Sequence, residues 1–225
     1  MKKLLTVAVA MLFVAGFAFG QGNVADIAQD GNSNSAAVAQ AGASHEAYIN
    51  QFGTNVAEVD QYGGDDNYAD IDQGAAGSAI SDPGTPSYNG DWIGGAYIEH
   101  NGSDNDASIT VRRSGAGASI FQEGSRNEAH QDLGSTQHRT TNWNRMGLDI
   151  DQIGDDNYAD QKTMFSFGMF GIQGMALVQE GDKNTATQLS RGGTYATMEV
   201  YQYGSRNNNP SESGNAFDLS AVGFD

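Results

Sequence analysis

The chain reads Ala25-Asp26-Ile27-Ala28-Gln29 soon after its start, and this pattern, Ala-x-[Ile/Val]-x-Gln, returns four times in succession. The four later copies end at Gln40, Gln51, Gln61 and Gln73. Side chains of a β-strand point alternately to its two faces, so the alternation predicts strands with Ala, Ile or Val, and Gln on one face. Successive glutamines are 11, 11, 10 and 12 residues apart, which leaves only a few residues for each connection.

A second pattern, Gln-x-Gly-x-x-Asn-x-Ala, overlaps these strands and continues through the chain. It is complete at Gln29/Gly31/Asn34/Ala36, Gln122/Gly124/Asn127/Ala129, Gln152/Gly154/Asn157/Ala159 and Gln179/Gly181/Asn184/Ala186. A copy at Gln202/Gly204/Asn207 lacks only the Ala, and another near Gly102 has His100 in place of Gln. Gly and Asn tolerate positive φ better than other residues, so the segment predicts a tight turn.

The strongest turns recur in units of about 22 residues. They follow Gln29, Gln51, Gln73, His100, Gln122, Gln152, Gln179 and Gln202, at steps of 22, 22, 27, 22, 30, 27 and 23. Halfway through the later units the expected Gln is missing at Val111, Leu133, Thr163 and Ser190, but Gln131, Gln161 and Gln188 stand two residues earlier on the same strand face. A unit of two strands and two turns must stack on its neighbours to bury its apolar face. The sequence therefore predicts an all-β fold, a β-solenoid of about eight stacked strand-turn-strand coils.

Stacking also explains how so polar a chain can fold. Leu, Ile, Val and Phe make up only about 15% of the residues after Gly20, a share at which disorder is expected for a highly charged chain. In a stack, however, inward Gln and Asn can form ladders in which each amide donates to one neighbouring coil and accepts from the other. The glutamines, asparagines and glycines of the repeats are therefore the candidate structural residues.

Composition excludes several classes of function. The chain has 225 residues, no cysteine and a net charge of −17. It therefore has no disulfide or thiolate metal site, and it lacks the clustered basic residues that nucleic-acid binding needs. Lys2 and Lys3, an apolar run and the small residues Ala18 and Gly20 predict a signal peptide over 1–20, so the mature chain is expected to be exported without a membrane span.

The remaining sequence predicts a single repeat domain over residues 21–213. Two stretches interrupt it and are expected to be loops: 74–95, which contains Pro83 and Pro86, and 134–146, which contains Trp143 between arginines. Residues 214–225 are expected to form a tail or a capping strand.

The repeat resembles the curlin repeat, whose family pattern is Ser-x5-Gln-x-Gly-x-x-Asn-x-Ala-x3-Gln, and the resemblance covers about residues 21–209. Departures include Asn in place of the leading Ser, and Val111 and Arg113 where the family has Gln and Gly. The resemblance implies an extracellular, pilus-like curli amyloid fibre of bacterial biofilms that serves adhesion. Its partners would be copies of itself, a nucleator or major subunit, an outer-membrane secretion channel and accessory factors. It leaves open whether this chain is the major subunit or the nucleator.

Other functions are less well supported by the sequence. The acids at 155–156 could bind calcium, but they lack the EF-hand and nonapeptide patterns. The four histidines have no metal-ligand spacing, and no nucleophile elbow or phosphate loop is present, so we expect no cofactor, no metal and no enzyme activity. A polysaccharide-degrading β-helix would need clustered Asp, Lys and Arg, and only 134–146 comes near that. A monomeric adhesin or a protein that binds ice or carbohydrate would need a regular outward array, such as a row of Thr.

Overall fold

The computed structural model describes residues 22–30, 34–52, 55–74, 95–111, 116–135, 146–165, 173–191, 197–213 and 219–224. The expected signal peptide, Gly31 and most of both expected loops lie outside these ranges. The strands are β1 Val24–Asp30, β2 Ser35–Ala43, β3 Glu46–Phe52, β4 Val56–Asp65, β5 Tyr68–Gln73, β6 Gly95–Ser103, β7 Asp106–Val111, β8 Ala116–Ser125, β9 Glu128–Ser135, β10 Met146–Ile153, β11 Tyr158–Phe165, β12 Gln173–Glu180, β13 Thr185–Arg191, β14 Thr197–Tyr203, β15 Asn208–Ser213 and β16 Leu219–Phe224.

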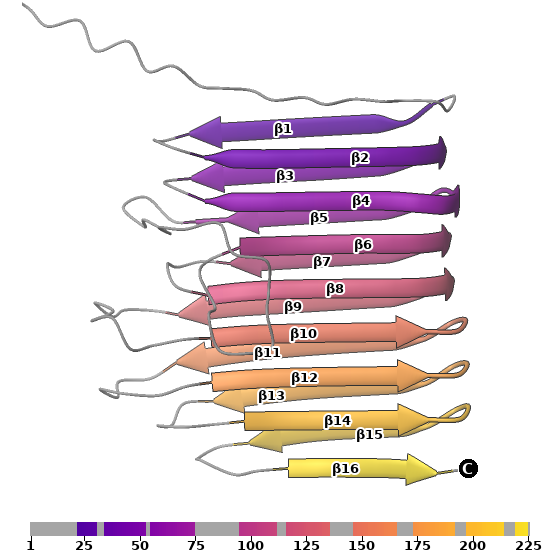
Figure 1. Ribbon diagram of the computed structural model, residues 1–225. Helices are drawn as coiled ribbons and strands as arrows, with labels where there is room; N and C mark the ends of the chain where they lie inside the picture. Colours follow the sequence, from indigo (N-terminus) through magenta and orange to yellow (C-terminus); the bar gives the residue numbers. More distant parts are fainter. Residues whose placement is uncertain are drawn as a thin grey trace, which may run out of the picture.

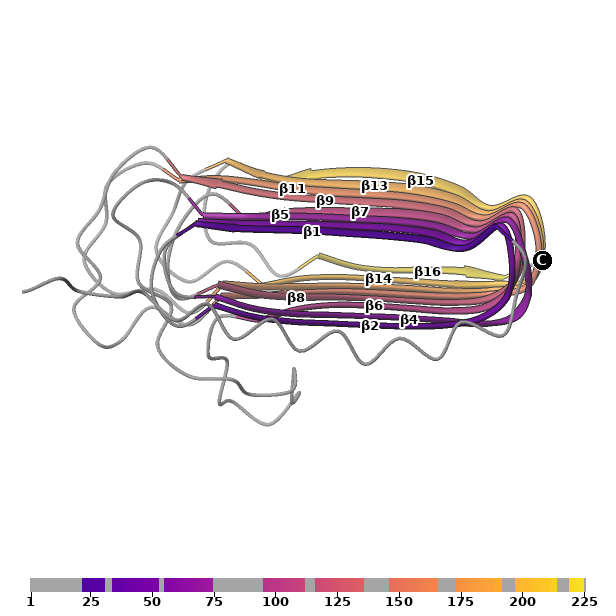
Figure 2. The ribbon, with the colours of Figure 1, turned by 90° about the horizontal axis from the view of Figure 1, so that it is seen from above.

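The strands form two stacked sheets of eight, which confirms the solenoid of about eight coils. The odd-numbered strands, in chain order, make one sheet (the odd sheet), and the even-numbered strands make the other (the even sheet). Each strand pairs in parallel with the strand two places along the chain, as in β1 with β3 and β12 with β14. The chain thus rises by one coil for every two strands (Figure 1, Figure 2). None of the described residues belongs to a helix that could cross a membrane.

The connections divide into two edges. Turns from even to odd strands cover residues 42–45, 63–67, 102–105, 124–127, 154–157, 181–184 and 204–207, and we call this side the regular edge. The odd strands end, and the even strands that follow them begin, at the opposite edge, as β5 and β6 or β9 and β10 do. Both expected loop insertions therefore begin and end at the same edge. The expected tail or capping strand contains β16, which pairs with β14.

The repeated turns do not form one series, contrary to the interpretation from the sequence. Gln73 ends an odd strand and is in register with Val111, whereas His100 lies in the even sheet between Gln61 and Gln122. The step from Gln73 to His100 thus passes from one sheet to the other. Early in the chain the Gln-Gly pattern follows both odd and even strands, but after Gln73 it follows only even strands. The series of strong turns read from the sequence therefore starts in the odd sheet and continues in the even sheet.

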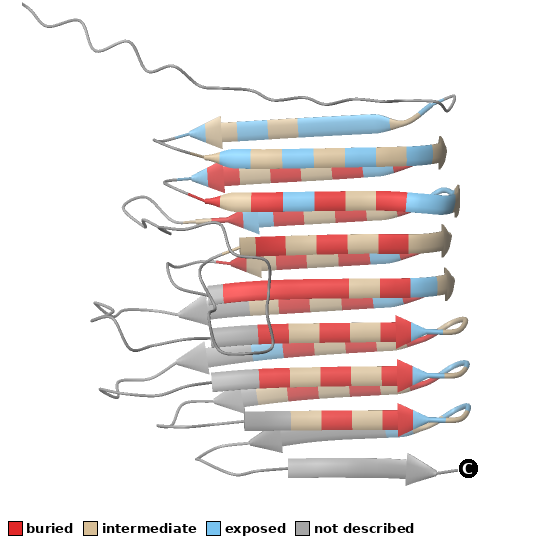
Figure 3. Cartoon of the chain, viewed as in Figure 1, coloured by how far each residue is buried: buried red, intermediate tan, exposed pale blue. Residues whose placement is uncertain are grey.

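The core is a narrow layer between the sheets. Burial alternates along most of the strands for which it is described, as in β3, where Ala47, Ile49 and Gln51 are buried and their neighbours face outward (Figure 3). Rows of Ala, Ile and Val are in register from coil to coil. In the odd sheet the row of Ile49, Ile71 and Ile109 continues as Gln131, Gln161 and Gln188. In the even sheet, the row of Ala96 and Ala118 continues as Leu148 and Met175, which adds apolar volume to the later coils.

Candidate functional site

The inward glutamines of the even sheet form a ladder with one direction. The Nε2 of Gln122 donates to the Oε1 of Gln152 at 2.8 Å, and the same bond joins Gln152 to Gln179 at 2.8 Å and Gln179 to Gln202 at 2.7 Å. Every bond runs from an earlier coil to a later one. The Nε2 of Gln152 also donates to the backbone oxygen of Glu128 at 3.1 Å, so both of its amide hydrogens are used inside the core.

Ladders with the same direction occur in the first coils. Gln29 donates to Gln51 at 2.8 Å and Gln51 donates to Gln73 at 2.9 Å in the odd sheet, while Gln40 donates to Gln61 at 2.9 Å in the even sheet. The first ladder ends at Gln73 because its in-register neighbour is Val111. Hydrogen bonds between side-chain amides offset the free-energy cost of burying these polar groups.

His100 interrupts the ladder of the even sheet. Its Nδ1 lies 3.5 Å from the Nε2 of Gln61, while its own Nε2 and the Oε1 of Gln122 have no partner among the described residues. Burial, with a smaller effect from His45, lowers the pKa of His100 to about 3, so the ring is neutral at physiological pH. The even sheet therefore contains two ladder segments, one on each side of His100.

Gln131, Gln161 and Gln188 lie in register but do not form a ladder. Each donates instead across the core to a backbone oxygen of the even sheet: Ser119 at 2.7 Å, Asp149 at 2.9 Å and Ala176 at 3.0 Å. The Oε1 of each is buried without a hydrogen-bond partner among the described residues. The hydrogen bonds of these glutamines therefore join one sheet to the other, whereas those of the ladders join one coil to the next.

The asparagines of the regular edge bond to backbone groups, not to one another's side chains as the sequence pattern suggested. The Nδ2 of Asn157 donates to the Gly181 oxygen at 2.7 Å, and its Oδ1 accepts the backbone N–H of Asn184 at 3.0 Å. Asn67, Asn105, Asn127 and Asn184 repeat the arrangement. At the last of these turns, Asn207 donates to Tyr203 of its own coil. On the other edge, the Oδ1 of Asn34 accepts the N–H of Asn55 at 2.9 Å.

The turn glycines have positive φ, as expected, but the asparagines do not. Gly124, Gly154, Gly181 and Gly204 have φ between 96° and 116°. The second residue with positive φ directly precedes the Asn in six turns of the regular edge, for example Arg126 at 59° and Asp156 at 58°, and is Ser44, before His45, in the first turn. The sequence pattern missed this position because its residue changes among Asp, Arg, Lys and Ser, of which only Asp favours the left-handed conformation.

The two carboxylates considered as calcium ligands, Asp155 and Asp156, accept hydrogen bonds from other groups of the protein. Asp155 Oδ1 accepts the N–H of Ser125 at 2.8 Å, and Asp156 accepts two bonds from the Arg126 guanidinium at 2.6 and 3.0 Å. Across the described part of the chain, no group of three or more His, Asp or Glu side chains is placed to hold a metal ion.

The two ends of the stack differ in the ladder groups that they leave unused. At the first coil, no donor among the described residues reaches the Oε1 of Gln29 or of Gln40. Toward the other end, the last ladder glutamine is Gln202 of β14, which is buried one coil before the end and in register with Gly223 of β16, a residue with no side chain to continue the ladder. The outer edges of β1 and β2 at one end, and of β15 and β16 at the other, have no neighbouring strand among the described residues (Figure 1). The first end thus offers amide oxygens, and both ends offer strand edges.

A half-buried acid on the outer face of the even sheet, Asp151, makes stability depend on pH. Asp151 is in register with Phe121 and Val178. Burial, with the nearby charge of Asp149, raises the pKa of Asp151 to about 6. Since this pKa lies above the value of about 3.9 for an unfolded chain, the folded state holds the proton more tightly, and stability is gained as pH falls from 7 toward 4.

We therefore expect Asp151→Asn to raise the free energy of unfolding at pH 7 by on the order of 1 kcal/mol, a figure reduced for the partial exposure of the group. The difference between the variant and the native chain should disappear near pH 4. Urea unfolding at several pH values measures it, and a difference that does not change with pH would contradict the assignment.

The comparisons with known proteins agree with this geometry. The family model described as the curlin associated repeat matches residues 20–53. These residues contain β1, β2 and β3 and the first glutamine ladder bond. No match to the chain was found among the curated proteins or the solved structures. The match at residues 20–53, on a chain that repeats the same strand and turn through eight coils, supports its assignment to the curlin-repeat family.

Proposed function

We propose that this chain is a structural subunit of an extracellular, curli-like amyloid fibre that grows by stacking coils of one copy on those of the next. The observation that carries the proposal is the pair of open ends, each with two strand edges that have no neighbouring strand among the described residues. The amide oxygens of Gln29 and Gln40 lie at the first of these ends, where they would accept hydrogen bonds from donors of another copy. Parallel strand edges at both ends would continue the backbone hydrogen bonding.

Such growth extends the contacts that already hold the coils together. Within the chain, each coil joins the next through in-register backbone pairing in both sheets and through side-chain amides. A joint between copies would repeat this cross-β arrangement with a second molecule. The fibre would serve the biofilm matrix and adhesion, after export through an outer-membrane channel with accessory factors.

A role as the nucleator of the same system is favoured by one observation. The last coil differs from the first, because Ser213 and Gly223 stand where Gln29 and Gln40 stand in the first coil. A chain whose two ends differ can start a fibre of another subunit from one end. In this role it would stay soluble alone and accelerate the fibre growth of a regular partner. A monomeric adhesin would do neither.

Thioflavin T fluorescence after dilution from denaturant tests the proposal, together with fibre diffraction. A lag that seeds shorten, with reflections near about 4.8 and 10 Å, is expected for a fibre subunit. Across a joint, Gln29 and Gln40 would face Ser213 and Gly223 of the other copy, so at most one side-chain hydrogen bond, from a serine hydroxyl, would join them. The double variant Gln29→Leu/Gln40→Leu removes that bond, worth about 1 kcal/mol, so seeded growth should slow roughly fivefold.

Asp26→Leu is the matched control, because it places the same side chain on the outward face of β1. Equal growth rates for the double variant and this control would contradict coil stacking through the ladders. A chain that stays monomeric with no effect on other curlin-type subunits would favour the adhesin.

A further inference from the structure

The regular edge carries a row of charged side chains, one from each of six consecutive turns. Each residue directly precedes the turn asparagine and has a positive φ, between 56° and 67°. In chain order the row is Asp66, Asp104, Arg126, Asp156, Lys183 and Arg206. We call it the charged row.

The charged row is straight and evenly spaced, because each member is bonded to the coil before it in the same way. The backbone N–H of each donates to a carbonyl oxygen of the preceding turn at 2.9–3.0 Å, as Asp104 does to Asp65 and Lys183 does to Asp155. Five of the six side chains are exposed and Asp156 is partly exposed. The turns form the smooth edge seen at the right of Figure 2. The charges are thus displayed at the regular spacing of the sheets, about 4.8 Å.

When the charged row is read in reverse, every position carries the opposite sign to the same position in the forward order. From the first coil the order is negative, negative, positive, negative, positive, positive. We propose that the regular edge binds the same edge of a second copy of this chain, with the two solenoid axes antiparallel and a two-fold axis between Arg126 and Asp156. Asp66 then faces Arg206 of the other copy, and Asp104 faces its Lys183. If the two axes were parallel and in the same register, each of the six residues would face the same residue of the other copy, which makes six pairs of like charge.

The neighbouring rows fit the same two-fold axis. The row before the charged row is Asp65, Ser103, Ser125, Asp155, Asp182 and Ser205. Reversal places an Asp opposite a Ser at every position, so no carboxylate meets another. Beyond the row of turn glycines that comes next, reversal places Tyr62 opposite Tyr203 and Ile153 opposite Glu123. These two tyrosines and Ile153 are three of the five exposed large hydrophobic side chains of the described residues. An isologous contact of this kind buries the same patch on both copies.

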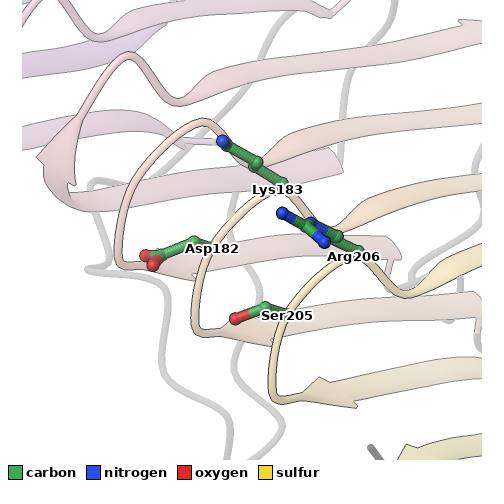
Figure 4. Close-up of a pocket in the computed structure, with 4 residues that line it drawn as sticks. All are labelled: Asp182, Lys183, Ser205 and Arg206. Atoms are coloured by element: carbon green, nitrogen blue, oxygen red, sulfur yellow. The ribbon is translucent and has the colours of Figure 1, made fainter.

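The last two turns have room for the acids of a second copy. Lys183 and Arg206 project from consecutive turns beside a pocket of about 340 Å³, which Asp182 and Ser205 also line (Figure 4). Neither cation has an ion-paired or hydrogen-bonded acid among the described residues. Arg126, by contrast, pairs with Asp156 of its own chain near the two-fold axis. The two unpaired cations at one end and the two acids at the other are the groups that a second copy would neutralise.

Sedimentation of the folded chain tests the contact, which does not depend on end-to-end growth. We expect a dimer at about 10 mM salt that dissociates at about 1 M, where the screening length falls from about 30 to about 3 Å. Lys183→Asp should weaken the dimer at least tenfold, because it places like charges opposite Asp104 at two symmetric positions. The swap Asp104→Lys/Lys183→Asp should restore it. Aspartate and lysine both occur in the left-handed conformation at other positions of the charged row, so the variants are expected to fold.

Lys162→Asp is the matched control, since it makes the same change of net charge on the outer face of the odd sheet. Cross-linking reports the orientation, because the chain has no cysteine of its own. Ser125→Cys lies near the two-fold axis and should cross-link to its mate, whereas Ser205→Cys should not. A monomer at low salt, equal effects of Lys183→Asp and Lys162→Asp, or cross-linking through Ser205→Cys would overturn the proposal.

Discussion

Gly154→Ala is expected to unfold the solenoid or to reduce its free energy of unfolding by more than about 3 kcal/mol. Gly154 has a φ of +116°, which a residue with a Cβ rarely adopts. A Cβ there would collide with the carbonyl oxygen of Gly181 in the next coil and lie 2.8 Å from its carbonyl carbon. Because that carbonyl belongs to the stacked backbone, the clash can be relieved only by separating two coils.

Gly22→Ala is the control for this variant, because it shares a positive φ without the clash. Gly22 has a φ of +92°, and the nearest atom to an added Cβ is the Ser44 Oγ at 3.7 Å. It should therefore show only the conformational cost, about 1 kcal/mol. Urea unfolding followed by circular dichroism compares the two. If both variants lost a similar free energy of unfolding, the requirement for glycine in the turn would come from its backbone conformation and not from the close stacking of coils.

Gln152→Leu is the second variant with a large expected effect, a loss of about 2–6 kcal/mol. It leaves the Nε2 of Gln122 without its acceptor and the Oε1 of Gln179 without its donor, both inside the core. Each buried polar group left unpaired costs about 1–3 kcal/mol. The leucine itself fits the apolar surroundings, so the loss would come from the broken ladder and not from the lost volume.

Gln161→Leu makes the same substitution at an equally buried position and should change stability by less than about 1 kcal/mol. Gln161 makes one cross-core bond, to Asp149, and its Oε1 has no partner. Leucine removes that bond and removes an unpaired acceptor at the same time, so the two effects oppose each other. Equilibrium unfolding of both variants decides the point. Equal losses would show that burial alone, and not the ladder, determines the cost of losing an inward glutamine.

The strands and the number of coils were predictable because their signal is local. Alternation along segments such as 47–51 places Ala, Ile and Gln on one face without knowledge of any neighbour. The spacing of about 22 residues then requires coils of two strands. The inward position of Gln131, Gln161 and Gln188 followed from the same alternation.

The partners of those side chains were not predictable from the alternation. Gln152 and Gln161 are both inward and buried, yet one bonds to the next coil and the other across the core. The difference depends on which residue stands in register in the adjacent strand and on how far the opposite sheet lies. Likewise, Asn157 supplies side-chain bonds to backbone groups, and the left-handed conformation falls on Asp156.

The sequence by itself determined the secondary structure, the face that each side chain takes and the solenoid class, since these depend on a period of two and a repeat of about 22. Only the tertiary structure decided the register and three features that depend on it: the transfer of the strong turn between sheets after Gln73, the break at His100 and the alignment of the charged row. The physical reason is that stacking brings together residues 20 or more positions apart. Insertions of different lengths between them hide from the sequence which residues become neighbours.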